Sequence, residues 1–149
     1  MAVGSCTFRT EGYGSKHWDK TRTGQVLPNA LKDANRFLYR SAHSVIVANQ
    51  DECQIGSWVL FSGQLPAAMT STHASIGRVT EILQVAGRAR EQQRLADYIT
   101  LQLAQTLGTP LQHGFPRLKP GFASILTTPK VTVAIFVSCR ANILIFSLI

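Results

Sequence analysis

Two glycine-bracketed apolar runs constrain the fold of this chain more than any other feature of its sequence. The first, IGSWVLFSG, spans 55–63, and the second, IGRVTEILQV, spans 76–85 and is followed by Ala86-Gly87. Aromatic and β-branched residues dominate the first run, which favours a strand. The second run alternates imperfectly, so a strand with a bulge and a short helix both fit, and the flanking glycines favour the strand. We predict that the two runs pair as neighbouring strands and nucleate the core.

Shorter segments around these runs carry weaker patterns. The β-branched run at 44–48 predicts a strand, whereas 31–40 fits either a short helix or the start of a strand. Residues 95–107 fit a helix and a strand equally well, because their apolar residues match both periods. Four prolines in 108–130 predict an extended connection rather than a packed element.

The fold class that follows is mostly β, or α+β. We expect a small, partly open β-barrel-like core with an irregular N-terminal arm and an apolar C-terminal tail. A length of 149 residues suits one domain. The predicted organisation is a flexible basic arm at 1–35, a small β-rich domain at 36–118, and an extended linker with an apolar tail at 119–149.

The composition describes a basic protein. Fifteen Lys and Arg residues against eight Asp and Glu give a formal net charge of +7, which favours anionic partners. The chain has too few charges and too many apolar residues for a typical disordered protein. Three widely spaced cysteines argue against a disulfide framework and for a reducing compartment, and the N-terminus has no apolar signal segment. We therefore predict an intracellular protein, with the nucleus as the expected location and a membrane as the alternative.

Arginines in the second half of the core provide the candidate nucleic-acid-binding residues, which are Arg78, Arg88, Arg90 and Arg94. Such residues would contact phosphates if they were exposed together. The competing interpretation is a solvated surface, because acidic residues are interspersed among them. Arg78 and Glu81 are three positions apart, so a regular strand would place them on opposite faces.

No motif for catalysis or for cofactor binding stands out. The histidines and cysteines lack metal-ligand spacing, the glycine-rich N-terminal stretch lacks the order of a P-loop, and no nucleophile elbow is present. We predict no catalytic, cofactor or metal site, no small-molecule substrate and no enzymatic activity.

The last 19 residues, 131–149, are the most apolar part of the chain. As a helix they would rise about 28 Å, close to the hydrocarbon thickness of a bilayer, but Arg140 would lie at the centre at a cost of about 3 kcal/mol. The alternative is a β-hairpin of 131–137 and 143–149. The tail therefore supports a second prediction, a small tail-anchored membrane protein, and a truncated or mispredicted gene product is a third explanation for it.

The run IGSWVLFSG, a loop and then SIGRVTEIL resemble the opening of a bromo-adjacent-homology domain. The same stretch is similar to uncharacterised fungal proteins linked to mobile elements, and the two resemblances cover about residues 53–118. They imply a small β-barrel in chromatin or mobile-element biology. Ser57 stands where the domain commonly has Asp, and no residue of a ligand cage carries over. The predicted function is a non-enzymatic interaction module, chromatin- or nucleic-acid-associated, with protein or nucleic acid as its partner.

Overall fold

The two glycine-bracketed runs pair as predicted in the computed structural model of the chain. β6 (Trp58–Phe61) lies antiparallel to β7 (Ser75–Val85), and Trp58 is directly opposite Arg78. The register of β7 shifts between Val79 and Glu81, so the imperfect alternation reflects a bulge. The structure describes residues 2–8, 14–61, 75–87, 94–107, 117–134, 136–140 and 143–147.

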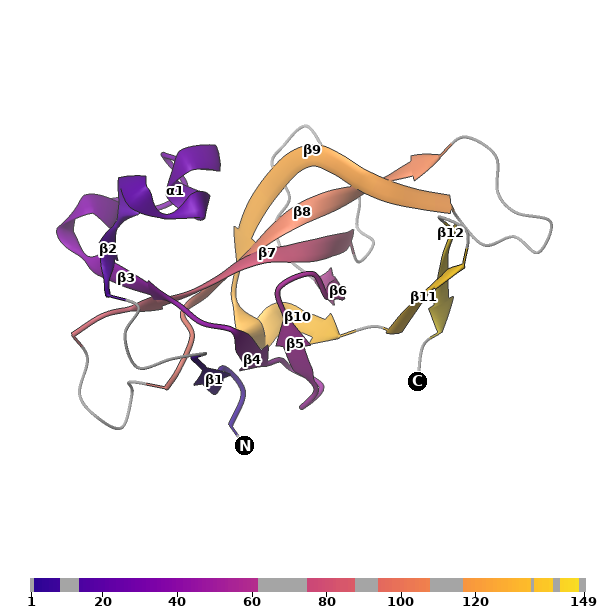
Figure 1. The fold of residues 1–149 in the computed structure, drawn as a ribbon, viewed down its shortest axis with the longest axis horizontal. Coiled ribbons are helices and arrows are strands. Elements are labelled where there is room, and N and C mark those ends of the chain that lie inside the picture. The colour runs from indigo at the N-terminus through magenta and orange to yellow at the C-terminus, as the bar shows by residue number, and fades with distance from the viewer. Residues whose placement is uncertain are drawn as a thin grey trace.

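β7 is the central strand of a seven-stranded sheet. One of its edges pairs with β6 and β3, and the other pairs with β8, which in turn pairs with β9. The long strands curl into a half-barrel over which β9 arches (Figure 1). The other members of the sheet are β2 (Lys16–His17), β3 (Leu38–Ser41), β8 (Tyr98–Leu107), β9 (Arg117–Thr127) and β10 (Thr132–Ala134).

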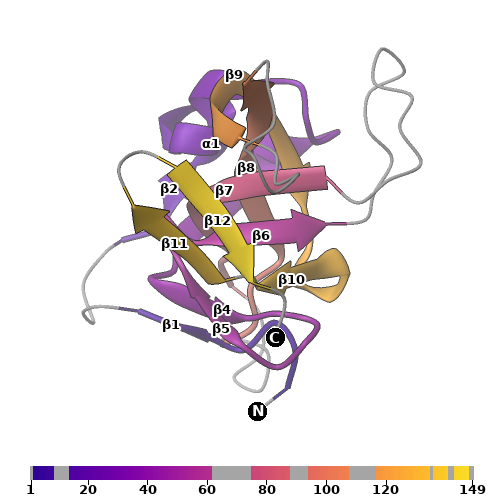
Figure 2. The same cartoon turned by 90° about the vertical axis from the view of Figure 1, so that its right-hand side faces the viewer.

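A small three-stranded sheet covers one face of the large sheet. It consists of β1 (Cys6–Thr7), β4 (Ser44–Ile46) and β5 (Glu52–Gln54) and lies next to β6 (Figure 2). The first hydrophobic core fills the space between the two sheets. Its buried members include Cys6, Val45, Val47, Cys53, Val59, Phe61, Val79, Ile82, Ile99, Leu101 and Leu103.

An N-terminal lobe, residues 18–37, covers part of the opposite face. It holds a 3₁₀ helix at Trp18–Lys20, α1 (Arg22–Val26) and a 3₁₀ helix at Ala34–Arg36. A second hydrophobic core lies beneath it, formed by Trp18, Ala34, Tyr39 and Leu83 with Leu31, Val85, Tyr98 and Leu126 packed around them. The sequence predicted a mobile arm here, but the lobe packs onto the sheet because Trp18, only 2% exposed, anchors it.

Three other expectations are settled by strand pairing. Residues 98–107 form a strand rather than a helix, and the helix-or-strand segment at 31–40 divides into a 3₁₀ helix followed by β3. The predicted unpaired connection at 108–130 is wrong for Arg117–Thr127, which pairs with β8 as β9. Proline is tolerated on this strand because Pro120 lies at a register shift, where a ladder hydrogen bond is already interrupted.

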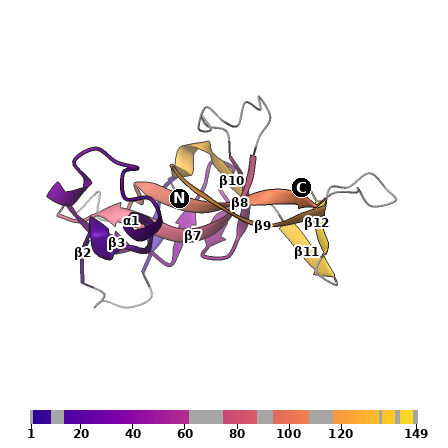
Figure 3. The ribbon, with the colours of Figure 1, turned by 90° about the horizontal axis from the view of Figure 1, so that it is seen from above.

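The tail forms strands. β10 joins the main sheet beside β6, and β11 (Phe136–Arg140) pairs with β12 (Ile143–Ser147) as a hairpin. The hairpin lies at one end of the molecule and the N-terminal lobe at the other (Figure 3). The predicted hairpin of 131–137 and 143–149 is thus confirmed only in part, because 132–134 pair with β6 and the first strand of the hairpin is Phe136–Arg140. In the ranges described above, none of the helices has the length and apolar character needed to cross a membrane.

Candidate functional site

The bulge in β7 decides which side chains share the face opposite the first core. Arg78 pairs with Gln102 and Glu81 pairs with Thr100, so Thr80 is the extra residue between them. Because the bulge adds one position, Arg78 and Glu81 lie on the same face, and the expectation of opposite faces is wrong. Glu81 is also not the solvated residue that the sequence suggested, since it is only 7% exposed.

Glu81 joins the N-terminal lobe to the sheet. Its Oε2 accepts hydrogen bonds from the Thr23 backbone N at 2.6 Å and from Thr23 Oγ1 at 2.5 Å. Its Oε1 accepts from Ser41 Oγ at 3.1 Å and from the Arg22 backbone N at 3.4 Å. The Thr23 hydroxyl uses its hydrogen in the bond to Glu81. Thr100 Oγ1 is therefore the donor in its hydrogen bond with Thr23 Oγ1, 2.6 Å away. Both carboxylate oxygens are therefore occupied, and the cluster is a structural anchor.

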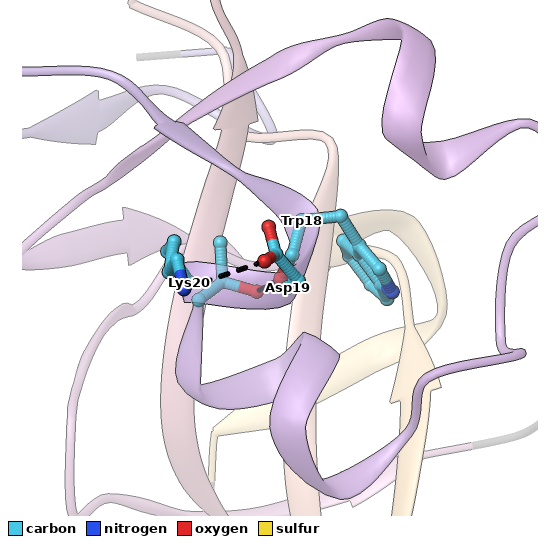
Figure 4. Close-up of polar contacts among 4 residues, drawn as sticks. Trp18, Asp19 and Lys20 are labelled. Carbon is cyan, nitrogen blue, oxygen red and sulfur yellow. Dashed lines mark hydrogen bonds and ion pairs between the residues drawn. The ribbon is translucent and has the colours of Figure 1, made fainter.

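The lobe directs its charges outward. Trp18 packs its ring 5.2 Å from that of Tyr39 and donates from Nε1 to the Pro28 carbonyl oxygen. Lys20 Nζ lies 3.5 Å from Asp19 Oδ2, on the side away from the Trp18 ring (Figure 4). Arg36 forms the other ion pair of the described residues, with Asp33. The lobe thus covers one half of the face and neutralises part of its own charge.

The other half of the face carries a row of side chains across four strands. Trp58 of β6 is opposite Arg78 of β7, Arg78 is opposite Gln102 of β8, and Gln102 is opposite Ser124 of β9. Directly paired residues of antiparallel strands project on the same face. Arg78 is exposed and the other three are partly exposed. We call Trp58, Arg78, Gln102 and Ser124 the open row.

Arg78 is held in place without losing its charge. Its Nε donates to the Gly56 carbonyl oxygen at 3.3 Å, and no ion pair to Arg78 occurs within the described residues. The turn at Gly56 is fixed to β7 by a hydrogen bond from the Gly56 backbone N to the Val79 carbonyl oxygen at 2.7 Å. Gly56 has φ +94°, a conformation that favours glycine. The guanidinium is therefore held at the Gly56 turn, on the strand position paired with Trp58, and has no acidic partner among the described residues.

Gln102 continues the row toward β9. Its Nε2 donates to the Gly121 carbonyl oxygen at 2.7 Å, which fixes the amide orientation and leaves Oε1 as an acceptor. An indole ring, a guanidinium, an amide and a hydroxyl thus follow one another across a rigid sheet. These groups bind by stacking, by charge and by hydrogen bonding.

Of the four predicted arginines, the structure describes Arg78 and Arg94 and places these two apart. Arg78 is in the open row, but Arg94 lies at the other end of β7, where its carbonyl oxygen accepts from the Cys6 backbone N at 2.6 Å. Arg88 and Arg90 lie outside the described residues. Only Arg78 is therefore carried forward as a site residue.

Sequence reasoning missed the other three members of the open row. The signal for Trp58 was present, because WVLF alternates and only Val59 and Phe61 are needed for the first core. Gln102 and Ser124 gave no signal of their own. They enter the row only through the register of β8 and β9, which the sequence left unassigned.

The buried cysteines are not reactive groups. Burial raises the pKa of the Cys6 thiol to about 11 and that of the Cys53 thiol to about 12, the charges of Asp51 and Glu52 adding to the latter shift. Both thiols are therefore protonated and unreactive at neutral pH. No group of His, Cys, Asp and Glu suited to a metal ion occurs in the part of the chain that the structure describes.

A concavity of about 340 Å³ lies at the far end of the covered half. Phe37, Tyr39, Val85 and Tyr98 line it together with Lys32 and other residues. Most of this lining is apolar and belongs to the packing of the lobe, so it offers fewer polar groups to a ligand than the open row.

Comparisons with known proteins give a family and no activity. A family model described as "Domain of unknown function (DUF8590)" matches residues 7–143. No curated protein matches the chain, and no solved structure matches it.

Proposed function

We propose that this chain, which belongs to the DUF8590 family, is a non-enzymatic module that binds single-stranded nucleic acid on the open row. The family description names no activity, so the proposal is argued from the surface of the chain itself. The observation that carries this proposal is the direct cross-strand pairing of the partly exposed Trp58 with the exposed Arg78. The ring offers a stacking surface, and the adjacent guanidinium offers donors and charge.

A single strand suits this geometry better than a duplex. Base stacking on Trp58 requires an unstacked base, which a single strand presents and a regular duplex does not. Arg78 lacks an acidic partner among the described residues and can neutralise a phosphate or donate to a base edge. The net charge of +7 adds a general attraction for the backbone.

Equilibrium binding of a fluorescently labelled single strand, measured by anisotropy in a salt series, tests the proposal. Affinity should fall steeply between about 50 and about 200 mM salt because phosphate contacts release counterions. Arg78→Ala should weaken binding and reduce the salt slope by about one unit. Trp58→Ala should weaken binding about tenfold or more. A duplex of the same length should bind less tightly.

Arg36→Ala is the matched control, because Arg36 is also exposed but is paired with Asp33 in the lobe, away from the open row. It removes the same charge and should weaken binding much less than Arg78→Ala. Equal effects of the two substitutions would assign binding to net charge alone. Absence of binding at low salt would remove the proposed function.

A further inference from the structure

We propose that Phe122 is a second base-stacking residue of the same site, so that a bound single strand crosses the sheet from Trp58 on β6 to Phe122 on β9. This inference rests on the proposed function and extends it to the length of strand that is recognised. Phe122 is 97% exposed, far more than any other large apolar residue whose side chain the structure describes. A ring with both faces in solvent is free to stack on a nucleic-acid base.

A bulge in β9 presents Phe122. Gln102 pairs with Ser124 and Ala104 pairs with Pro120, so residues 121–123 all lie opposite the single residue Leu103. The chain must therefore loop outward between the two pairs, with Phe122 at the middle of the loop.

Gly121 fixes this bulge closely against β8. A Cβ atom at Gly121 would lie 2.8 Å from the Leu103 carbonyl oxygen and 2.7 Å from Gln105 Cγ, so only glycine permits this approach. The carbonyl oxygen of Gly121 also accepts the hydrogen bond from Gln102 Nε2 at 2.7 Å. Phe122 thus stands on a backbone that a member of the open row holds in place.

The position of Phe122 continues the open row. Phe122 lies two residues before Ser124, in the bulge between the pairs Gln102–Ser124 and Ala104–Pro120, so it stands next to the end of the row on β9. Three strand spacings separate β6 from β9, about 14 Å. Two aromatic rings at the ends of such a row, with Arg78 between them, match a strand of about four nucleotides, the lower end of the usual site size of single-strand-binding folds.

The test compares the affinity of the full chain and its variants for single strands of about two and about eight nucleotides. Phe122→Ala should weaken binding of the longer strand about tenfold and leave the shorter strand within about twofold. Trp58→Ala should weaken binding of both lengths. Phe122→Trp should keep full affinity, and its added indole fluorescence should be quenched by the longer strand only. Phe37→Ala is the control, because Phe37 is 50% exposed but lies in the lobe.

The outcomes separate the two proposals. If Trp58→Ala weakens binding and Phe122→Ala changes neither length, this inference is overturned and the proposed function stands. If the affinity is the same for every variant and for both strand lengths, the proposed function and this inference both fail. Sedimentation of the wild type and of Phe122→Ala tests whether Phe122 instead binds a second copy of the chain. A wild-type dimer that the substitution dissociates would overturn the inference. Thermal unfolding should be unchanged in Phe122→Ala, since a fully exposed ring packs against nothing.

Discussion

The sheet face opposite the first core has one half covered by the N-terminal lobe and one open half. The same strands place a buried, hydrogen-bonded side chain in the covered half and exposed side chains in the open half. In the covered half, Glu81 is buried and both of its carboxylate oxygens accept hydrogen bonds from the protein. In the open half, Arg78 is exposed, donates to the Gly56 carbonyl oxygen and is paired across the strands with Trp58. The bulge at Thr80 lies at the border between the halves. The strands alone therefore do not decide what is buried; the N-terminal lobe does.

This difference separates stability from binding. A buried polar group is costly unless it is paired, so the covered half must be fully hydrogen-bonded for the chain to fold. A charge and an aromatic ring left on the surface are under no such requirement. Substitutions in the covered half should therefore change stability, and those in the open half should change binding.

The largest expected effect is that of Glu81→Gln. The new amide NH2 is a donor where the carboxylate oxygen was an acceptor, so it faces the backbone N–H of either Thr23 or Arg22 without a bond. We expect a loss of about 3 kcal/mol in the free energy of unfolding, measured by denaturant titration. Glu52→Gln is the control, because Glu52 is exposed and accepts from Ser44, and it should cost less than about 1 kcal/mol. Equal losses in the two variants would mean that the lobe does not depend on Glu81.

A smaller effect on stability is expected from the first hydrophobic core, which lies on the other face of the sheet. The pKa of Cys53 rises from its ordinary value of 9.0 to about 12 on folding, chiefly through burial. Above pH 9 the unfolded chain loses the thiol proton while the folded chain keeps it, so stability is full below pH 9 and falls as pH rises toward 12. At about pH 10.5 the loss should be about 2 kcal/mol from this thiol.

The Cys53→Ala variant removes the contribution of this thiol to the pH dependence of stability. Its stability should fall less steeply above pH 9 than that of the wild type, although its stability at neutral pH should be lower because of the cavity. Denaturant titrations at a series of pH values give both slopes. Parallel slopes would show that the thiol does not contribute.

Local patterns predicted the centre of the fold, and pairing decided the rest. The β-prone composition around Trp58 and Val79 was sufficient to predict β6 and β7 and their contact. Residues 98–107 matched two periods, and only the neighbours β7 and β9 make them a strand. The lobe was missed because its anchor is one tryptophan among glycines and polar residues, with no apolar period to indicate it.

The site was less predictable than the fold. Arg78 was a candidate because it is basic, but its neighbours in space come from strands 20 or more residues away in the chain. A single bulge residue, Thr80, reverses the relation between Arg78 and Glu81, and nothing in the run GRVTEIL marks where that bulge falls. The open row is therefore formed by the register of the paired strands, which the local composition does not reveal.

Tyr39→Phe tests the covered half with a milder change. The hydroxyl of the buried Tyr39 donates to the Ala34 carbonyl oxygen at 3.1 Å, so the substitution leaves that acceptor without its partner and keeps the ring in place against Trp18. We expect a loss of about 1 kcal/mol in the free energy of unfolding and no change in nucleic-acid affinity. A change in affinity without loss of stability would contradict the separation of the two halves.

Arg78→Ala should have the smallest effect on stability and the clearest effect on binding. Among the described residues, the exposed guanidinium makes one hydrogen bond, at 3.3 Å, to the Gly56 carbonyl oxygen, and that oxygen can bond to water instead. We expect a change of less than about 0.5 kcal/mol in the free energy of unfolding. Arg78→Lys should keep most of the charge-dependent binding but lose the planar donors. If Arg78→Ala destabilised the chain as much as Glu81→Gln does, the open half would be part of the structural framework, and the contrast on which the proposed site rests would disappear.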